Sequence, residues 1–306
     1  MTLYNQSVLG DLDISPQQLK DILLLAIDMK ATPEKYGDAL KGKSIATLYE
    51  KPSLRTRVSF DVGINKLGGH AVYLDQQNGA MGKREDVADF GANLSCWCDA
   101  IVARVMSHAT LTTLKSAASV PVVNSLCDLY HPCQALADYM TLQELFGEVK
   151  GLTLAYIGDG NNVTHSLMLA GAQLGVNLVV LTPEGYGVDE QIVQQATKIA
   201  VENQCTVTVT NDVNALGNVD AIYADTWISM GDDKSLEQIL GTFKPYQITK
   251  ELMQSANAKY FMHCQPAHRD EEVTADVLDS EQSVILRQAE NRMWAQNALL
   301  HSILVK

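Results

Sequence analysis

Two hydroxyl groups and two guanidinium groups fall within the five residues Ser53-Leu54-Arg55-Thr56-Arg57. Hydroxyls and forked guanidinium donors match the oxygens of a phosphate group, and a guanidinium group can donate two hydrogen bonds to it at once. The apolar run 44–49 precedes this stretch and predicts a buried strand, and Pro52 keeps the backbone extended after it. These residue types therefore predict a phosphate-binding corner at the end of a strand.

The element that must carry this corner is a helix. Apolar side chains recur at Phe60, Ile64 and Leu67, which predicts a helix over 54–67 with Ser53 as its N-cap. The first turn of a helix has unpaired N–H groups and the positive end of the helix dipole, and both favour a bound anion. The alternative is an ordinary capped surface helix whose arginines are solvated.

The composition limits the classes of protein that the chain can form. It has 306 residues, of which 46% are hydrophobic and 19% charged, so it can build the cores of two domains of about 150 residues each. The net charge of -13 argues against nucleic acid or an anionic membrane as the main partner, because both require a basic surface. The sequence has neither an apolar run of about 18 residues nor a signal-peptide pattern, so we expect a cytoplasmic protein.

The cysteines form no CxxC pairs, and most of them lie in apolar runs, so we expect reduced and buried thiols rather than a metal site. Cys264 differs because it follows an apolar run and lies beside a histidine. A covalent mechanism at Cys264 is a weaker interpretation, since neighbouring residues in a strand point to opposite faces. The six cysteines are Cys96, Cys98, Cys127, Cys133, Cys205 and Cys264.

Strand-like and helix-like segments alternate along the whole chain, which predicts an α/β fold with parallel sheets covered by helices on both faces. We place a first domain at 1–147 and a second at 148–287, with a closing helix in 288–306 that packs back on the first domain. Ligands bind beyond the carboxyl ends of parallel strands, so we expect the active site in a cleft between the domains. The predicted strands are 44–49, 70–75, 100–105, 121–125, 152–157, 178–181, 206–210, 221–224 and 260–263. The predicted helices start at Ser15-Pro16 and then cover 54–67, 85–95, 110–118, 132–146, 164–173, 189–203 and 288–304.

In the first half, the loops that follow the predicted strands carry unusual polar residues. Arg104 lies in an apolar run, where it either pairs with an acid or faces a ligand. His131 and Gln134 lie on the first turn of a predicted helix, where a histidine can donate to a carbonyl oxygen or serve a structural role.

The second half shows the same pattern. The turn 158–162 invites a dinucleotide interpretation, but the third glycine of GxGxxG is missing, and Asn162 could instead bind a small polar substrate. The loop 225–231, which begins with Asp225, suits recognition of an ammonium and a carboxylate group together, as in an amino acid; it could equally be an aromatic-anchored surface loop. Arg292 on the last helix is a further candidate anion ligand or a solvated helix residue.

Five motifs together resemble the aspartate/ornithine carbamoyltransferase family, and the resemblance covers essentially the whole chain. The Ser-Met-Gly and His-Cys-x-Pro motifs are similar to those of its ornithine-specific branch. The motifs are Ser53-x-Arg55-Thr56-Arg57, His131-Pro132-x-Gln134, Asp225-x-Trp227-x-Ser229-Met230-Gly231, His263-Cys264-x-Pro266 and Glu290-Asn291-Arg292.

This resemblance implies transfer of the carbamoyl group of carbamoyl phosphate to the δ-amine of L-ornithine, giving L-citrulline and phosphate in arginine metabolism. It implies no metal and no cofactor, because carbamoyl phosphate is already activated. It also implies a homotrimer, or a multiple of trimers, with active sites at subunit interfaces.

The resemblance assigns the site residues one by one. The implied catalytic residues are Arg104, His131, Asp225 and Cys264. The implied carbamoyl-phosphate ligands are Ser53, Leu54, Arg55, Thr56, Arg104, His131, Gln134, Cys264, Gln265 and Arg292. The implied ornithine ligands are Asn162, Asp225, Ser229 and Met230.

Three residues depart from the family pattern. Ala80 stands where relatives often have Gln or His, Asp86 where Ser or Thr is usual, and Gln265 where Leu is common. We expect these departures to affect carbamoyl-phosphate affinity more than reaction type, and Lys83 or Arg84 of a neighbouring subunit could compensate.

Three alternatives stay open at this point. A nucleotide-dependent oxidoreductase would need the missing glycine fingerprint. A catalytically silent homologue would keep the fold and lose the transfer reaction. A carbamoyltransferase for an acylated ornithine would differ only in its amine substrate.

Overall fold

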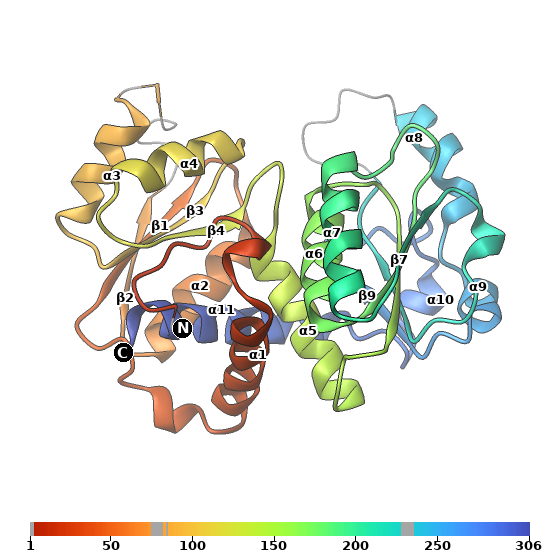
Figure 1. The fold of residues 1–306 in the computed structure, drawn as a ribbon, viewed down its shortest axis with the longest axis horizontal. Coiled ribbons are helices and arrows are strands. Elements are labelled where there is room, and N and C mark those ends of the chain that lie inside the picture. The colour runs from red at the N-terminus through yellow and green to blue at the C-terminus, as the bar shows by residue number, and fades with distance from the viewer. Residues whose placement is uncertain (1–2, 75–81, 84, 228–235) are drawn as a thin grey trace. The chain divides into compact units, whose positions relative to one another are not determined.

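The structure is a computed structural model that describes residues 3–74, 82–83, 85–227 and 236–306 (Figure 1). The described chain forms two compact units. Unit 1 comprises Met1–Leu145 and Glu290–Lys306, and unit 2 comprises Phe146–Ala289. Unit 1 is therefore built from two separate stretches of the sequence.

Unit 1 contains a four-stranded parallel sheet in the order β2-β1-β3-β4. Residue Ala103 of β3 pairs with Asn124 of β4, whereas Arg104 pairs with Leu126, so the register shifts directly before Arg104. Such irregularities turn the end of a strand and redirect its side chain. The strands are β1 (Ser44–Tyr49), β2 (His70–Leu74), β3 (Ala100–Arg104) and β4 (Val122–Leu126).

Helices cover both faces of this sheet. On one face, Leu94 of α3 and Leu111 of α4 join a core with Ala46, Leu48 and Ile101 of the strands. In Figure 1, α3 and α4 lie on one side of the sheet of unit 1 and α2 and α11 on the other. The helices are α1 (Pro16–Ala31), α2 (Leu54–Lys66), α3 (Val87–Ser95), α4 (His108–Ala117), α5 (Pro132–Phe146) and α11 (Ile285–Leu304).

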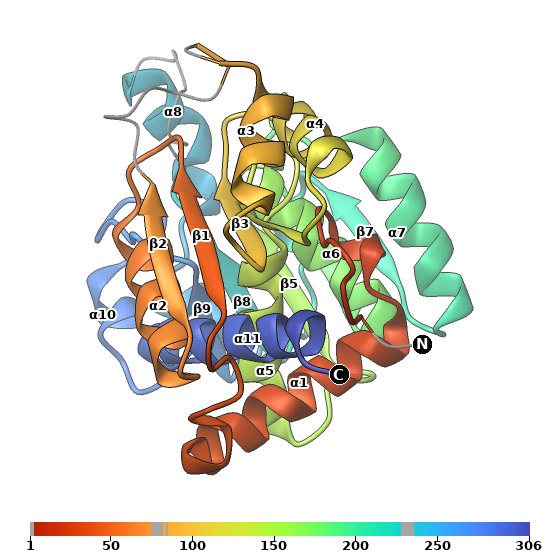
Figure 2. The same ribbon diagram turned by 90° about the vertical axis from the view of Figure 1, so that its left-hand side faces the viewer.

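Helix α11 packs against α2 and α1 within unit 1 (Figure 2). The side chain of Asn297 on α11 reaches the backbone of α2 at Gly63, where no Cβ intervenes. Lys30 of α1 connects three elements, because its Nζ lies 3.1 Å from Glu144 Oε1 on α5, 3.0 Å from Glu290 Oε2 and 2.7 Å from Asn291 Oδ1 on α11. This ion-pair network fixes the C-terminal helix to the first stretch of the chain.

Unit 2 contains a five-stranded parallel sheet in the order β7-β6-β5-β8-β9. On one side α6 and α7 lie next to each other, with Ala172 against Ala200 (Figure 1). On the other side the sheet packs against the short helices α9 and α10. The strands are β5 (Thr153–Ile157), β6 (Asn177–Leu181), β7 (Val207–Thr210), β8 (Ala221–Ala224) and β9 (Tyr260–His263). The helices are α6 (Asn162–Leu174), α7 (Glu190–Glu202), α8 (Leu236–Phe243), α9 (Lys250–Ser255) and α10 (Ala275–Leu278).

The predicted fold class is confirmed: two parallel sheets, each with flanking helices. The three short helices α8, α9 and α10 were not among the predicted elements. They have 8, 6 and 4 residues, which is too short for a helical period to stand out from the sequence. Among the described residues, no helix combines the length and the apolar character that a membrane span requires.

Candidate active site

The predicted phosphate corner lies between β1 and α2. Ser53 caps α2, and its Oγ accepts a hydrogen bond from the backbone N–H of Thr56 at 3.3 Å. Thr56 is 2% exposed, and its Oγ1 accepts from Arg104 Nη1 at 3.3 Å. Leu54 and Arg55 are exposed on the same first turn. The corner is thus joined to the end of β3 through Thr56.

Arg57 points away from this corner. Its guanidinium carbon lies 3.6 Å from the centre of the Tyr73 ring, and its Nε lies 3.6 Å from Asp61 Oδ2. Residues two apart on a helix point to nearly opposite sides, so Arg55 and Arg57 cannot face one ligand from the same helix. The anion site expected from this stretch therefore consists of Ser53, Arg55 and Thr56 without Arg57.

Four buried side chains of unit 1 form a cluster, and Arg104 joins this cluster to Thr56. Arg104 ends β3, His131 and Gln134 stand at the start of α5, and Arg292 comes from α11; all four are at most 7% exposed. One guanidinium nitrogen of Arg292, Nη1, donates to Gln134 Oε1, and the other, Nη2, lies 3.5 Å from His131 Nε2. The residues are far apart in sequence and meet because parallel strands end at one edge of the sheet.

Burial and mutual repulsion shape the charges of this cluster. Burial, together with the positive charges of Arg292 and Arg55, lowers the pKa of Arg104 to about 10. Burial and the two guanidinium groups of Arg292 and Arg104 hold the pKa of His131 well below 6.5, so the imidazole is neutral at pH 7. A ligand with two negative charges, such as a phosphate group, would offset the repulsion between the arginines. The cluster is therefore suited to bind phosphate.

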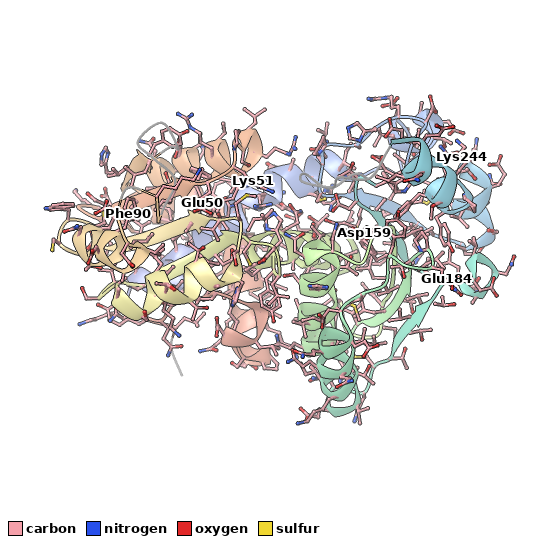
Figure 3. All side chains as sticks on the ribbon, turned by 90° about the horizontal axis from the view of Figure 1, so that it is seen from above. Glu50, Lys51, Phe90, Asp159, Glu184 and Lys244 are labelled. Carbon is pink, nitrogen blue, oxygen red and sulfur yellow. The ribbon has the colours of Figure 1, made fainter. Side chains whose placement is uncertain are left out.

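Glu50 is a residue that the sequence analysis did not single out. It follows β1 directly, is 7% exposed, and its Oε2 accepts from the backbone N–H of Met106 at 2.8 Å (Figure 3). The backbone N–H of Glu50 donates to the carbonyl of Arg104 at 2.8 Å. Glu50 therefore ties the loop after β1 to the loop after β3. Its position, immediately after a strand and before the phosphate corner, is the signal that could have identified it.

In unit 2, the polar site is centred on the carboxylate of Asp225 at the end of β8. Asp225 is 6% exposed and accepts three hydrogen bonds. The donors are Asn161 Nδ2 at 2.8 Å, the backbone N–H of Thr226 at 2.8 Å and the thiol of Cys264 at 2.9 Å. This arrangement holds a negative charge beside the ends of β5, β8 and β9, where an ammonium group could bind.

The contact between Cys264 and Asp225 bears on the chemistry of the thiol. A carboxylate only accepts hydrogen bonds, so the thiol donates and keeps its proton. A thiolate beside a carboxylate would be repelled, so this geometry does not activate Cys264 as a nucleophile. The structure therefore favours a binding role for Cys264.

Asn161 caps α6 and positions the turn after β5. Its Oδ1 accepts from the backbone N–H groups of Val163 and Thr164, which leaves its Nδ2 for Asp225. The carbonyl of Asp159 in the same turn accepts from the buried Tyr156 hydroxyl at 2.8 Å (Figure 3). Asn162 begins α6 and is half-buried. Asn162 was a predicted site residue and Asn161 was not, although an asparagine directly before a helix is a strong capping signal.

His263 shapes the loop that carries Cys264. Its Nδ1 accepts from the backbone N–H of Gln265 at 2.8 Å, so the proton lies on Nε2 and faces Glu272 Oε1 at 3.1 Å. Gln265 has a positive φ of 60° and is followed by a cis peptide bond to Pro266. The His263–Glu272 pair is fully buried and holds this turn in place.

Two groups in unit 2 have the residue types of metal ligands. Asp225, His263 and Cys264 each offer one atom, all within 4.8 Å of one another, and so do His268, Glu271 and Glu272. In the first group both ring nitrogens of His263 already have partners, so a metal would have to displace Gln265 or Glu272. The second group also lies at the Glu272 carboxylate that holds His263.

Some predicted residues lie outside the described part of the chain. These are Ser229 and Met230 of the ornithine motif, Ala80, and Arg84. Asp86 is described and caps α3, with its Oδ1 accepting from the backbone N–H of Ala88 at 2.8 Å. Asp caps a helix about as well as Ser or Thr, so this departure from the family pattern preserves the local structure.

Together, fold and sites define an α/β protein with two parallel-sheet units, one with a buried cluster that contains two arginines and the other with a buried, hydrogen-bonded carboxylate at a strand end. The chain belongs to the aspartate/ornithine carbamoyltransferase family. Residues 6–144 match the carbamoyl-P binding domain of that family, and residues 150–303 match its Asp/Orn binding domain.

Individual relatives agree with this assignment. The chain is 57% identical over 299 residues to an ornithine carbamoyltransferase of Moritella profunda and 56% identical to one of Vibrio sp. (strain 2693), in both cases covering 98% of this chain and 99% of the relative. The solved structure of the ornithine carbamoyltransferase from Pyrococcus furiosus is similar with a TM-score of 0.95 and 44% identity, covering 99% of this chain and 98% of that one.

Proposed function

We propose that the protein transfers the carbamoyl group of carbamoyl phosphate to the δ-amine of L-ornithine, which gives L-citrulline and phosphate. The observation that carries this proposal is the buried cluster of Thr56, Arg104, His131, Gln134 and Arg292, which has the donors that a carbamoyl phosphate needs. The full-length similarity to ornithine carbamoyltransferases supports ornithine as the amine substrate.

Carbamoyl phosphate is assigned to unit 1. Ser53, Arg55 and Thr56, with the backbone N–H groups near Leu54, would bind the phosphate at the start of α2. Arg104 and Arg292 would donate to the carbonyl oxygen, where negative charge develops when the amine attacks. His131 is neutral, so it adds a polar contact without adding a third positive charge.

L-Ornithine is assigned to unit 2. Asp225 would bind an ammonium group with its carboxylate, and Asn162, Ser229 and Met230 would contact the amino-acid end. Cys264 and the backbone of Gln265 would lie beside the reacting amine, with the Cys264 thiol held by Asp225.

The reaction follows from the chemistry of the two substrates. The δ-amine must be neutral to attack, although a free alkylamine of this kind is protonated below about pH 10. Its nitrogen bonds to the carbamoyl carbon, a tetrahedral oxyanion forms, and the bond from carbon to the phosphate oxygen then breaks. Arginine donors stabilise the oxyanion, and the α2 corner stabilises the departing phosphate.

Citrulline formation tests this function. The assay supplies carbamoyl phosphate with L-ornithine, and in parallel with N-acetylornithine, putrescine or L-aspartate. We expect product from ornithine alone, and Arg55→Ala should reduce kcat/KM about 100-fold or more, because a charge-assisted phosphate contact contributes most in the transition state. A folded protein that carbamoylates none of these amines would refute the proposal.

A role in arginine biosynthesis and a cytoplasmic location are parts of the same proposal. Two relatives, from Pyrococcus furiosus and Campylobacter jejuni, are named anabolic enzymes. Buried free thiols such as Cys127 and Cys133 suit a reducing compartment. Expression in an arginine auxotroph that lacks this activity should restore growth without arginine, and cell fractionation locates the protein.

We also propose a homotrimer. Leu54, Val58 and Val62 form an apolar stripe on α2 and are 75%, 49% and 42% exposed, which suits contact with another copy of the chain. Light scattering should give the mass of three chains or a multiple. If Lys83 or Arg84 reaches a neighbouring site, a Lys83→Ala/Arg84→Ala double variant should raise the KM for carbamoyl phosphate, and an unchanged KM would remove this idea.

A further inference from the structure

Asp138 is a buried carboxylate to which none of the roles above has been assigned. It lies on α5, one turn after Gln134, and is 0% exposed. Its Oδ1 accepts a hydrogen bond from Gln134 Nε2 at 2.8 Å. A buried carboxyl group is costly to leave without hydrogen bonds, so the contact between Asp138 and Gln134 stabilises the folded site and ties the two side chains together.

The two neighbours of Gln134 fix the orientation of its amide. A carboxylate only accepts hydrogen bonds, so Asp138 draws the NH2 end of the amide toward itself. A guanidinium only donates, so Arg292 draws the carbonyl oxygen toward the cluster. Both partners therefore demand the same orientation, with Nε2 toward Asp138 and Oε1 toward Arg292.

This orientation presents an acceptor to the ligand. Among the side chains of Arg104, His131, Gln134 and Arg292, only Gln134 has an oxygen atom. A carbonyl oxygen has two lone pairs, and the Arg292 contact uses one of them. The second can accept from an NH2 group of a bound ligand, whereas a flipped amide would present hydrogen atoms to it.

We propose that Asp138 is a positioning residue that makes the site specific for a carbamoyl rather than an acetyl phosphate. The two molecules differ in that carbamoyl phosphate has an NH2 group where acetyl phosphate has a methyl group. Only the NH2 group can donate to Gln134 Oε1, and a methyl group would leave that buried oxygen without its second partner. The inference rests on the proposed function, since it concerns the same anion site.

The test compares the dissociation constants of carbamoyl phosphate and acetyl phosphate, measured by calorimetry on the full chain without ornithine. Asp138→Leu and Asp138→Asn have nearly the same shape, but only asparagine keeps an oxygen that can accept from Gln134. We expect Asp138→Leu to reduce the preference for carbamoyl phosphate roughly tenfold, because the Gln134 amide is then held by Arg292 alone and its buried Nε2 has lost its acceptor, so Oε1 is no longer fixed toward the ligand. We expect Asp138→Asn to retain most of the preference.

Two further variants separate positioning from general damage. Gln134→Leu removes the acceptor Oε1. Its preference for carbamoyl over acetyl phosphate is therefore the lowest value expected for the site. The double variant Asp138→Leu/Gln134→Leu should show no lower preference than Gln134→Leu alone, because Asp138 acts through Gln134. Asp11→Asn, a change at another buried carboxylate of unit 1, should leave the preference unchanged.

The inference is overturned if Asp138→Leu keeps the wild-type preference, or if Asp138→Asn and Asp138→Leu lose it equally. A further loss in the double variant would also overturn it. If Asp138→Leu does not fold, the Asp138→Asn and Gln134→Leu pair decides: full loss in the asparagine variant refutes the idea. Absence of citrulline formation with an intact binding preference would refute the proposed function and leave this inference standing.

Discussion

At the scale of single residues, burial decides which groups of the cluster are charged. Arg104 and Arg292 stay cationic although they are nearly buried, and they help to keep His131 neutral. Without its ligand, the site therefore holds like charges close together, which costs folding free energy. A bound anion should raise the free energy of unfolding, because it binds only the folded state and adds an opposite charge there.

The neutral state of His131 predicts how stability depends on pH. The pKa of His131 is depressed in the folded protein, so above about pH 6.5 neither the folded nor the unfolded chain is protonated there. As the pH falls below 6.5, His131 becomes protonated in the unfolded chain but stays neutral in the folded protein. The free energy of unfolding should then fall by up to about 1.4 kcal/mol per pH unit, until the folded pKa is reached.

Urea unfolding at a series of pH values between 7.5 and 5 measures this effect. His131→Gln, which is uncharged at every pH, should make the loss of stability shallower. Burial also lowers the pKa of His301, so His301→Gln serves as the matched control. This variant should remove only the smaller part of the pH dependence of stability that His301 contributes. Equal slopes for the wild type and His131→Gln would show that His131 does not carry the effect.

Several site residues could be predicted from the sequence because their types are unusual at strand ends. Arg104 within an apolar run and His131 at a helix start are examples. Asp138 and Glu272 could not be predicted, because the role of a single acidic residue in a helix or loop depends on the side chain that it contacts in the folded protein. Arg57 could have been set aside, because helical geometry alone separates it from Arg55.

At the scale of elements, the close packing of α2 against α11 predicts the effect of a single methyl group. Alanine is the better helix former by about 1 kcal/mol, but a Cβ at Gly63 would collide with the Asn297 side chain. We expect the collision to dominate, so Gly63→Ala should destabilise the protein by about 1–3 kcal/mol.

The matched control is Gly241→Ala on α8. Apart from the two chain neighbours of Gly241 and the backbone of its own helix, no atom of the described residues lies within 4 Å of the position that its Cβ would occupy. This change should therefore stabilise the protein by about 0.5–1 kcal/mol through helix propensity alone. Thermal unfolding of both variants tests the pair, and a stabilising Gly63→Ala would mean that Asn297 moves aside at little cost.

The strands and the longer helices were predictable from the sequence, and the shortest helices were not. Most strands of the two sheets are predominantly apolar, such as 152–157, and the long helices have caps such as Ser15, whose Oγ accepts from the backbone N–H of Gln18. The short helices α9 and α10 pack against the sheet, and α8 packs on Trp227, so these helices depend on tertiary contacts rather than on their own period. Tertiary contacts decide such segments, so a local pattern cannot reveal them.

At the scale of the whole molecule, the two units differ in how the chain builds them. Unit 2 is one continuous stretch with its own core, whereas unit 1 needs α11 from the end of the sequence. Several buried apolar side chains of unit 1 belong to this helix. They are Trp294, Ala295, Ala298, Leu299, Leu300 and Ile303.

The two units should therefore differ in whether they fold as separate fragments of the chain. Burying one Leu or Ile contributes about 1.5–3 kcal/mol, so the loss of α11 removes an amount comparable with the whole stability of a domain. We expect residues 146–289 to fold alone and residues 1–145 to remain unfolded. Circular dichroism and cooperative thermal unfolding measure this difference.

A linked fragment provides the control. Glu144 and Glu290 both contact Lys30, so the two cut ends of unit 1 lie close together. A short Gly/Ser linker from residue 145 to residue 290 should therefore restore a folded unit 1 that binds carbamoyl phosphate. If residues 1–145 fold equally well without α11, the helix is an attachment to the unit rather than a part of its core.

The split construction of unit 1 also sets an order in time during synthesis. The strands of its sheet leave the ribosome before unit 2, yet the helix that completes its core and brings Arg292 is translated after unit 2. Unit 2, although later in the sequence, is complete before unit 1 can be. For most of translation the first half of the nascent chain therefore lacks the part of its core that α11 supplies, and such incomplete states are bound by chaperones and prone to aggregate.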